Sequence, residues 1–452
     1  MFEKIDVVNA NGGWCWFQDE RSLVDPVAGI AVIGSVASPM GADGDTRAGD
    51  VEVTVVDLDS RPLAGQQSVL HAGFEFDDHD DPALWRRADG RWLAVYSRHK
   101  SDEYTFWRIS EPGDPSRWGP EQSYLWTPQF GGEPAPKGTP GRGVTYQNVH
   151  QLDGRLYCFA RAVNDDPCYL VSEDDGSTWS FGGRLLTREK IGYVNGYARY
   201  ASGAHLAEPD DARIDVIITE HHPRDFPTSI WHGYLADGAL HRSDGSVIGP
   251  VGRDIDDETP RAEDLTQVFA NGAVVDGQRM THCWTTDIRR GVDGRVVALF
   301  TARTDDDLGL DVPRSTTDPL PHALLRGVLA PGGSWEVRKV ADVGPQLLAH
   351  ETDYTGLASI DPDDVDSLYL STPVDPRGGG SDLGVHEILH GRTDDGGAGW
   401  TWTPITSGST VSSYRPIAVP GDPSRRVLTW FRGEMESSQR YACEVVLAVG
   451  KR

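Results

Sequence analysis

Residues Ser172–Trp179 read "SEDDGSTW", and this short stretch says most about the fold of the chain. It fits the Asp-box pattern Ser-x-Asp-x-Gly-x-Thr-Trp, in which the Ser and Asp side chains close a hairpin turn and the Trp packs beneath it. The pattern specifies a turn between two strands and indicates almost nothing about chemistry. The stretch "TDDGGAGWTW", which begins at Thr393, looks like a degraded second copy.

Short strand signals recur on both sides of this turn, and helical periodicity is nearly absent. Examples are "RWLAVYSRH", "RLYCFARAV" and "RVVALFTAR", each of which follows an Asp-Gly-Arg turn. Asp-Gly between apolar runs is a strong hairpin signal, because glycine accepts the positive φ that the turn requires. The repetition of one hairpin pattern indicates a radial array of small sheets. We therefore expect an all-β protein, with a β-propeller preferred to a large sandwich or a β-helix.

Composition limits the classes of protein to which the chain can belong. The 452 residues contain no Pro/Ser-rich linker, so we expect a single β-propeller domain over residues 1–452. No long apolar, charge-free run is present, which argues against a membrane partner. The net charge of −27 without a Lys/Arg cluster argues against nucleic acid. No signal peptide is visible, and we expect a cytoplasmic protein or a secreted one whose signal has been removed.

The five cysteines are scattered and form no Cys-x-x-Cys pair. This spacing predicts neither a disulfide framework nor a zinc ribbon. Cys158 and Cys168 are placed where neighbouring strands could pair them, but buried free thiols are the preferred interpretation.

Several segments, in order along the chain, together resemble the BNR-repeat polysaccharide lyases. They run from about Asn11 to about Asp364, and they read "NGGWCWFQDERSLVD", "DDHDDPALW", "TYQNVHQLDGRLYCFAR", "SEDDGSTWS", "GYARYAS", "TEHHPRD" and "ETDYTGLASIDPDD". That family consists of seven-bladed β-propellers and includes ulvan lyases and lyases that cut rhamnose–glucuronic acid linkages. The resemblance implies a seven-bladed propeller that cleaves 4-O-linked glucuronic acid by β-elimination.

The resemblance assigns catalytic roles to His79, His99, Tyr146 and Arg161. In β-elimination a cation neutralises the uronate carboxylate, a base removes the C5 proton, and an acid protonates the departing O4 oxygen. Arginine suits the carboxylate because its planar fork can bind both oxygens. Histidine and tyrosine suit the base and the acid, and the sequence does not decide between them. The acidic neighbours of His79 should raise its pKa. We expect these four side chains to converge in one cleft.

Substrate-binding roles are implied for a second set of residues: Asn148, Tyr197, Arg199 and His222. The segment "GYARYAS" departs from the "PYxKY" of the family, with Gly196 in place of proline and Arg199 in place of lysine. In a strand, alternation would put Tyr197 and Arg199 on one face. The reaction requires no cofactor. Some ulvan-type members hold a structural zinc near the histidine that matches His222, and a structural zinc or calcium ion is left open here, although Cys283 is the only thiol nearby.

Two other functions share the same sequence features. A sialidase-like glycoside hydrolase would need three arginines on the substrate carboxylate and an early Arg-Ile-Pro segment, which the chain lacks. A non-catalytic carbohydrate-binding propeller would use its tryptophans to stack on sugars. The expected partner is in every case an anionic poly- or oligosaccharide that contains uronic acid. The acidic composition favours an unsulfated rhamnose–glucuronate substrate over sulfated ulvan, and the sequence does not indicate an oligomeric state.

Overall fold

The computed structural model describes residues 2–136, 138–187, 196–203, 205, 210–252, 259–304, 319–348, 351, 353–378 and 380–452. The described helical segments are all short: α1 (Gly44–Arg47), η1 (Asp78–Asp80), η2 (Thr127–Phe130), η3 (Val163–Asp165) and η4 (Ala262–Asp264). None of them has the length and apolar character needed to span a bilayer. The chain divides into two compact units. Unit 1 comprises Met1–Thr187, Val251–Thr259 and Val419–Arg452, and unit 2 comprises Arg188–Pro250 and Pro260–Ala418.

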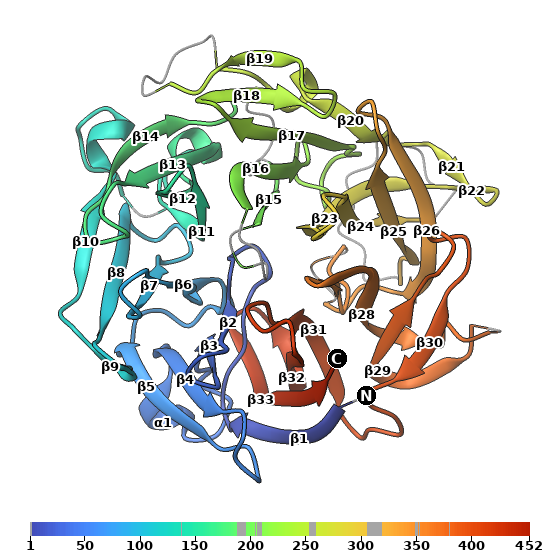
Figure 1. Ribbon diagram of the computed structural model, residues 1–452, viewed down its shortest axis with the longest axis horizontal. Coiled ribbons are helices and arrows are strands. Elements are labelled where there is room, and N and C mark those ends of the chain that lie inside the picture. The colour runs from blue at the N-terminus through green and yellow to red at the C-terminus, as the bar shows by residue number, and fades with distance from the viewer. Residues whose placement is uncertain are drawn as a thin grey trace. The chain divides into compact units, whose positions relative to one another are not determined.

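Unit 1 contains three antiparallel sheets of consecutive strands, ordered β2-β3-β4-β5, β6-β7-β8-β10 and β11-β12-β13-β14, with β9 added to β8 (Figure 1). The strands of the first sheet are β2 (Ser22–Asp25), β3 (Ile30–Val36), β4 (Val51–Asp57) and β5 (Gly65–His71). Those of the second are β6 (Ala83–Arg86), β7 (Trp92–Tyr96), β8 (Tyr104–Glu111), β9 (Asp114–Trp118) and β10 (Gln122–Leu125). Those of the third are β11 (Thr145–Leu152), β12 (Arg155–Arg161), β13 (Pro167–Ser172) and β14 (Ser180–Arg184).

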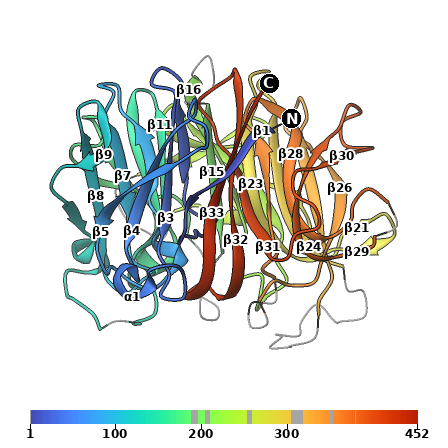
Figure 2. The ribbon, with the colours of Figure 1, turned by 90° about the horizontal axis from the view of Figure 1, so that it is seen from below.

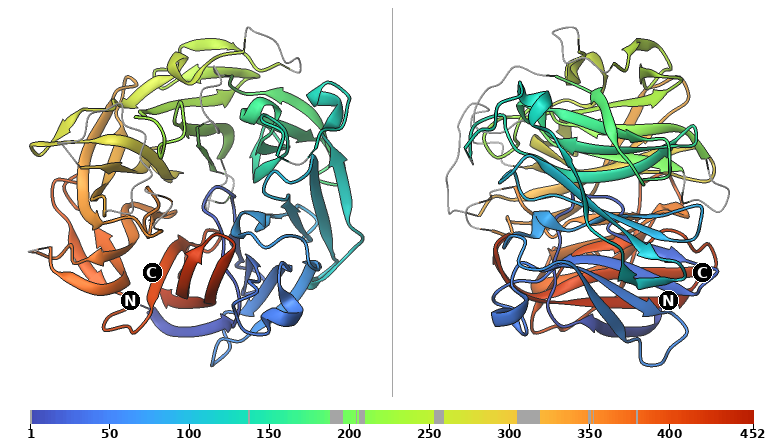
Figure 3. Two further views of the ribbon diagram at one scale, coloured as in Figure 1. Left: turned by 180° about the vertical axis from the view of Figure 1, so that it is seen from behind. Right: turned by 90° about the vertical axis from the view of Figure 1, so that its left-hand side faces the viewer.

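The two ends of the chain also pair with each other in unit 1. Strand β1 (Phe2–Asn9) runs antiparallel to β33 (Arg440–Lys451), which in turn pairs with β32 (Arg425–Ser437). The blue N-terminal strand lies along the red C-terminal strands in Figures 1 and 3. One sheet is therefore completed by both termini, as in a closed propeller.

Unit 2 contains three further antiparallel sheets, ordered β15 to β19 with β20 added to β17, β23 to β26, and β27 to β30. The strands of the first are β15 (Ala198–Gly203), β16 (Asp210–Ile218), β17 (Ile230–Ala236), β18 (Ala239–Arg242), β19 (Val247–Pro250) and β20 (Thr266–Phe269). Those of the second are β23 (Thr281–Arg290), β24 (Val296–Arg303), β25 (His322–Leu329) and β26 (Trp335–Gly344). Those of the third are β27 (Ala358–Asp361), β28 (Asp364–Val374), β29 (Asp382–Arg392) and β30 (Thr401–Pro404). The remaining strands are β21 (Val274–Val275), β22 (Gln278–Arg279) and β31 (Ser412–Ala418).

The seven larger sheets formed by the described residues confirm the prediction of an all-β, seven-bladed β-propeller. The Asp-Gly-Arg turns join the first two strands of three sheets, before β7, β12 and β24. The glycines of these turns, Gly90, Gly154 and Gly294, have φ values of 80°, 74° and 78°, as a tight hairpin requires. The single-domain prediction over residues 1–452 stays a prediction.

Apolar side chains from adjacent sheets form the cores of the units. In unit 1 one core cluster packs Val32 of β3 and Val53 of β4 against Leu84 of β6 and Trp92 of β7. Figure 2 shows β3, β4 and β5 side by side, with α1 near their lower end. All five cysteines are buried and free, which confirms the preferred interpretation of the thiols.

The Asp-box of unit 1 has the expected hydrogen bonds. The Ser172 hydroxyl accepts a hydrogen bond from the Gly176 amide at 2.8 Å, and the Asp174 carboxylate accepts one from the Thr178 amide at 2.8 Å. Trp179 is only 9% exposed. At the tip of the turn, the indole N–H of Trp85 donates to Asp175 at 3.1 Å, so that β6 of the preceding sheet supports the turn.

The degraded copy in unit 2 repeats this geometry. Thr393 accepts from the Gly397 amide at 2.8 Å, and Asp395 accepts from the Gly399 amide at 2.8 Å. Its Gly396 carbonyl lies 3.5 Å from a guanidinium nitrogen of Arg326 on the preceding sheet.

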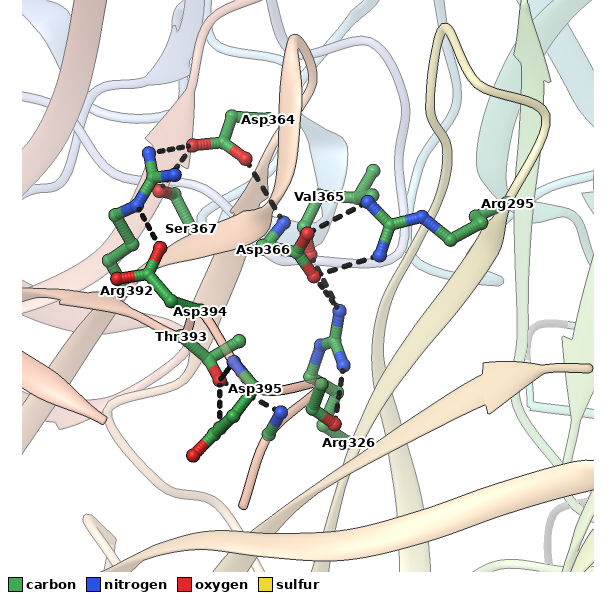
Figure 4. A network of polar contacts seen from close by, with 12 residues as sticks. Arg295, Arg326, Asp364, Val365, Asp366, Ser367, Arg392, Thr393, Asp394 and Asp395 are labelled. Carbon is green, nitrogen blue, oxygen red and sulfur yellow. Dashed lines mark hydrogen bonds and ion pairs between the residues drawn. The ribbon is translucent and has the colours of Figure 1, made fainter. Parts of the chain in front are cut away.

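A network of ion pairs surrounds this second turn (Figure 4). Asp366 binds Arg326 at 2.7 Å and Arg295 at 2.8 Å. Arg392 pairs with Asp364 at 2.9 Å and with Asp394 at 3.2 Å. The network ties β28 and the turn to the neighbouring sheet of unit 2.

Candidate active site

His79 and His99 lie against each other in unit 1. His79 is in the 3-10 turn η1, just before β6, and His99 follows β7, so the two residues flank one hairpin. Their imidazole rings stack with centroids 3.9 Å apart and planes inclined by 5°. His79 is 3% exposed, whereas 29% of the His99 side chain is exposed. The pair therefore presents one open edge.

Asp77 lies at one edge of the two stacked rings and binds both of them. Its Oδ1 is 2.5 Å from Nδ1 of His79, and its Oδ2 is 3.0 Å from Nδ1 of His99. Asp78 also approaches Nδ1 of His79, at 2.8 Å. Within the described part of the chain, no side chain or backbone group binds Nε2 of either histidine. Both Nε2 atoms are thus available to a ligand.

Tyr146 is a third aromatic residue beside His79 and His99. It is the second residue of β11 and has a φ of 63°, and the pairing of β11 with β12 is irregular between Thr145 and Asn148. Its ring centroid lies 5.5 Å from that of His79 and 6.0 Å from that of His99. The bulge at the start of β11 therefore directs the phenol to the histidine pair.

Arg161 lies over the tyrosine. It ends β12 directly opposite Thr145, and its guanidinium carbon is 4.6 Å from the centre of the Tyr146 ring. Arg161 and Tyr146 are each 6% exposed. The structure thus brings together all four residues to which catalysis was assigned, although their catalytic roles stay predictions.

The Asn148 side chain binds the backbone next to Tyr146. Its amide donates hydrogen bonds to the carbonyl of Phe17 at 2.6 Å and to the carbonyl of Tyr146 at 2.9 Å. The side chain is buried, at 1% exposure. Asn148 holds the backbone of Tyr146 in the bulged conformation, and its predicted contact with substrate stays a prediction.

The surroundings of His79 favour its charged form. Burial opposes a positive charge on the ring, but interactions with Cys15, Tyr146, Asp77 and Asp78 outweigh it and hold the pKa of His79 well above its ordinary value. This direction agrees with the expectation drawn from the acidic neighbours of His79.

The pKa of His99 is shifted in the opposite direction. Loss of contact with water at its partly buried ring lowers it, and the positive charge of His79 lowers it further, against the opposing effect of Asp77. Burial also disfavours a charge on Asp77, but His99 and His79 together hold the pKa of Asp77 well below its ordinary value. These shifts favour a charged imidazole on His79, a neutral imidazole on His99 and an ionised carboxylate on Asp77.

Two groups of possible metal ligands occur among the described residues, and both include His79. One consists of Cys15, Asp78 and His79, and the other of Asp77, His79 and His99. In the second group both Nδ1 atoms lie within hydrogen-bond distance of the Asp77 carboxylate, at 2.5 and 3.0 Å, so the three groups already contact one another directly. The arrangement therefore fits an acid–base pair better than a metal centre. His222 and Cys283, where the resemblance left a zinc ion open, belong to neither group.

The other predicted substrate-binding residues lie in unit 2. Tyr197 immediately precedes β15, and its hydroxyl is 3.0 Å from Nε2 of His222. Nδ1 of His222 accepts a hydrogen bond from the Arg224 amide at 3.1 Å, so a neutral His222 carries its proton on Nε2 and donates it to Tyr197. The indole ring of Trp284 packs against Tyr197 with centroids 4.9 Å apart.

Arg199 is part of the interior of unit 2. It is 1% exposed and lies 3.4 Å from Asp287, whose carboxylate also accepts the backbone N–H of Ile360 at 2.9 Å. Substrate contacts of Tyr197, Arg199 and His222 stay predictions, and for Arg199 the buried ion pair indicates a structural role.

Sequence reasoning missed Asp77 and the residue that holds it, Gln439. The Gln439 amide donates to Asp77 at 2.6 Å from a position 362 residues further along the chain. The acidic turn "DDHDDP" did point to a carboxylate beside His79, but nothing in the sequence singled out Asp77 among its four aspartates.

Comparison with known proteins identifies relatives of this fold. A family model described as BNR repeat-containing family member matches residues 50–342. Among solved structures, a PL25 ulvan lyase matches with a TM-score of 0.63 and 13% identity over 98% of this chain and 95% of that one. A PL25 ulvan lyase bound to -[GlcA(1-4)Rha3S]- matches with a TM-score of 0.61, 13% identity, and 98% and 94% coverage. The polysaccharide lyase Uly1 matches with a TM-score of 0.55, 10% identity, and 100% and 99% coverage. No curated protein sequence matches the chain.

Proposed function

The chain belongs to the BNR repeat-containing family, and from this membership and the geometry of its site we propose that it is a polysaccharide lyase. The proposed reaction is β-elimination at a 4-O-linked glucuronic acid. The observation that carries the proposal is the grouping of two stacked imidazoles, a phenol and a guanidinium. The solved lyases with this fold support the same class of reaction.

Each of these groups suits one task of the elimination. Arg161, together with the imidazolium of His79, supplies positive charge for the uronate carboxylate, which makes the C5 proton more acidic. The neutral ring of His99 accepts that proton at Nε2. The electron pair of the broken C5–H bond forms the C4–C5 double bond as the C4–O4 bond breaks. The hydroxyl of Tyr146 then gives its proton to the departing O4 oxygen.

The charges beside the site favour an unsulfated substrate. Arg98, next to His99 in the sequence, pairs with Asp102 at 2.5 Å, and Arg142, in the loop before β11, binds Glu103 at 2.7 Å. These guanidinium groups are already matched by carboxylates, and the chain as a whole carries a net charge of −27. A rhamnose–glucuronate linkage without sulfate is therefore the substrate that we propose.

The ultraviolet absorbance of the product tests the proposal. Elimination conjugates the C4–C5 double bond with the carboxylate, so a lyase acting on gum arabic, ulvan or pectin fragments produces an absorbance that a hydrolase does not. We expect the largest rate on the rhamnose–glucuronate side chains of gum arabic. Reducing ends without absorbance would indicate a hydrolase, and no release of product would indicate a carbohydrate-binding propeller.

Two substitutions test the assigned residues. We expect His99→Ala and Tyr146→Phe each to lower kcat by at least about 100-fold, because each removes a group that transfers a proton. His71→Asn is the matched control. His71 is the last residue of β5, pairs with Glu121 at 2.7 Å, and is not one of the residues of the proposed site. Circular dichroism checks that all three variants are folded. Full activity in both site variants would place the catalytic groups elsewhere.

A further inference from the structure

We propose that Asp77 is a positioning residue of the site, whose single carboxylate binds Nδ1 of both stacked imidazoles and fixes both Nε2 atoms on the opposite edge for the substrate. This inference rests on the proposed lyase function. It adds a residue that sequence reasoning did not assign, and it states why one histidine acts as base while the other carries charge.

The carboxylate is fully occupied by donors. Oδ1 accepts the backbone N–H of His79 at 3.1 Å and faces Nδ1 of the same residue at 2.5 Å. Oδ2 faces Nδ1 of His99 at 3.0 Å and accepts from Gln439 at 2.6 Å. A carboxylate has about four acceptor sites, and all of them are used here. Asp77 is 5% exposed, so its orientation is set by these four contacts rather than by water.

The two contacts of Asp77 with the imidazoles determine which nitrogen of each ring carries a proton. A carboxylate only accepts hydrogen bonds, so Nδ1 of each histidine must carry a proton. A neutral His99 with its proton on Nδ1 has a lone pair on Nε2, which is the form that a base requires. A charged His79 has a proton on Nε2 as well. Because the rings are stacked and both Nδ1 atoms face the same carboxylate, one acceptor and one donor lie together on the opposite edge of the stack.

The contacts of Asp77 with the two rings also determine how much positive charge the histidine pair carries. Two imidazolium rings stacked at 3.9 Å would repel each other, so the pair holds one proton in excess rather than two. Asp77 stabilises that one positive charge. From the surrounding elements, Cys15, Tyr146 and Asp78 act on His79, Arg161 acts on His99, and Glu75 accepts the backbone N–H of His99. Asp80 also faces His79, but its raised pKa favours the neutral carboxyl.

The substitution Asp77→Asn replaces one acceptor by a donor at nearly constant shape. The asparagine can accept from only one Nδ1–H, and its NH2 group forces the other ring to carry its proton on Nε2. A neutral ring in that tautomer cannot act as base through Nε2. The loss of negative charge also lowers the pKa of His79, since the imidazolium loses its counter-charge.

The matched control is Asp80→Asn. Asp80 lies in the same turn, is fully buried, and has no hydrogen-bond partner for either carboxylate oxygen within the described residues. Burial raises the pKa of Asp80 well above its ordinary value, which favours the neutral carboxyl, the form whose charge asparagine preserves. This variant separates the effect of Asp77 from a general disturbance of the turn.

Two measurements test the inference. In the pH dependence of kcat/KM, we expect Asp77→Asn to move the alkaline limb to lower pH by at least about one unit and to lower kcat about 100-fold or more, with KM changed only a few-fold. Asp80→Asn should retain the limbs of the unaltered protein. Unshifted limbs in Asp77→Asn, or the same shift in both variants, would overturn the inference.

Nitrogen-15 NMR of histidine-labelled protein reads the tautomers without any substrate, with His79→Gln and His99→Gln assigning the signals. We expect His99 neutral with its proton on Nδ1, and His79 charged to a pH above its ordinary pKa. His99 protonated on Nε2 in the unaltered protein would overturn the inference even if Asp77→Asn fails to fold. The expected tautomers without any unsaturated product would support Asp77 and reject the lyase.

Discussion

Tyr146 occupies the left-handed region of backbone conformation, with a φ of 63°. For a non-glycine residue this conformation costs about 1–2 kcal/mol, and such residues occur often at functional sites. The hydrogen bond from Asn148 to the Tyr146 carbonyl, at 2.9 Å, contributes to holding it. Tyr146 is also the residue whose phenol faces the histidine pair. The unfavourable backbone conformation therefore places a functional group in the site.

The opposite pKa shifts of His79 and His99 predict the pH dependence of the reaction. His99 must be neutral to accept a proton, and since its pKa is lowered, kcat/KM should rise along an acid limb below the ordinary imidazole value of 6.5. His79 must be charged, and since its pKa is raised well above 6.5, activity should fall only along an alkaline limb above that value. The initial rate of absorbance increase, measured from pH 4 to pH 10, checks both limbs.

The control for this profile is His71→Asn, which should retain both limbs. A single limb centred near the ordinary imidazole pKa would contradict the account, because it would show an isolated, unperturbed histidine.

At the scale of the element, the two Asp-box turns form the same pattern of hydrogen bonds from two different sequences. Both place a hydroxyl and a carboxylate at the same two positions, Ser172 with Asp174 and Thr393 with Asp395. In the complete copy the Thr178 hydroxyl also donates to Asp174 at 2.7 Å. Gly399 stands at the corresponding position of the second copy and offers no side chain.

The Asp-box aspartates are therefore expected to differ in their effect on stability. Asp174→Ala removes the acceptor of the Thr178 amide and hydroxyl and should lower the free energy of unfolding by about 1–2 kcal/mol. Asp395→Ala removes fewer hydrogen bonds and should lower it less. Guanidinium-induced unfolding, followed by tryptophan fluorescence, measures both.

Glu173→Ala is the control for the complete copy, because this neighbouring side chain is exposed and, among the described residues, forms an ion pair only with the exposed Arg155, at 3.1 Å. It should have almost no effect. An equal or larger loss from Glu173→Ala or Asp395→Ala would contradict the interpretation of the turn.

At the scale of the whole molecule, the features that could be predicted from sequence are local. The Asp-Gly-Arg turns and the Asp-box depend on residues next to one another, and the structure has them where the sequence predicted. The grouping of His79, His99, Tyr146 and Arg161 was implied only by resemblance to a family. The sequence did not predict a role for Asp77, because its partner Gln439 is 362 residues away and no local pattern encodes that contact.

The pairing of β1 with β33 explains how such a distant contact arises. The strands at the two ends of the chain form one sheet, and the turn between β32 and β33 carries Gln439 to the carboxylate beside His79. The last strands of the chain thus take part in the site as well as in closing the sheet.

Proton NMR of the products released from a rhamnose–glucuronate oligosaccharide tests the central claim most directly. The account predicts an olefinic H4 signal from a new unsaturated uronate end and the loss of the H5 signal of that residue, both absent with His99→Ala. A saturated glucuronic acid that retains H5, released together with a new reducing end, would contradict it, because the C5–H bond would then have remained intact.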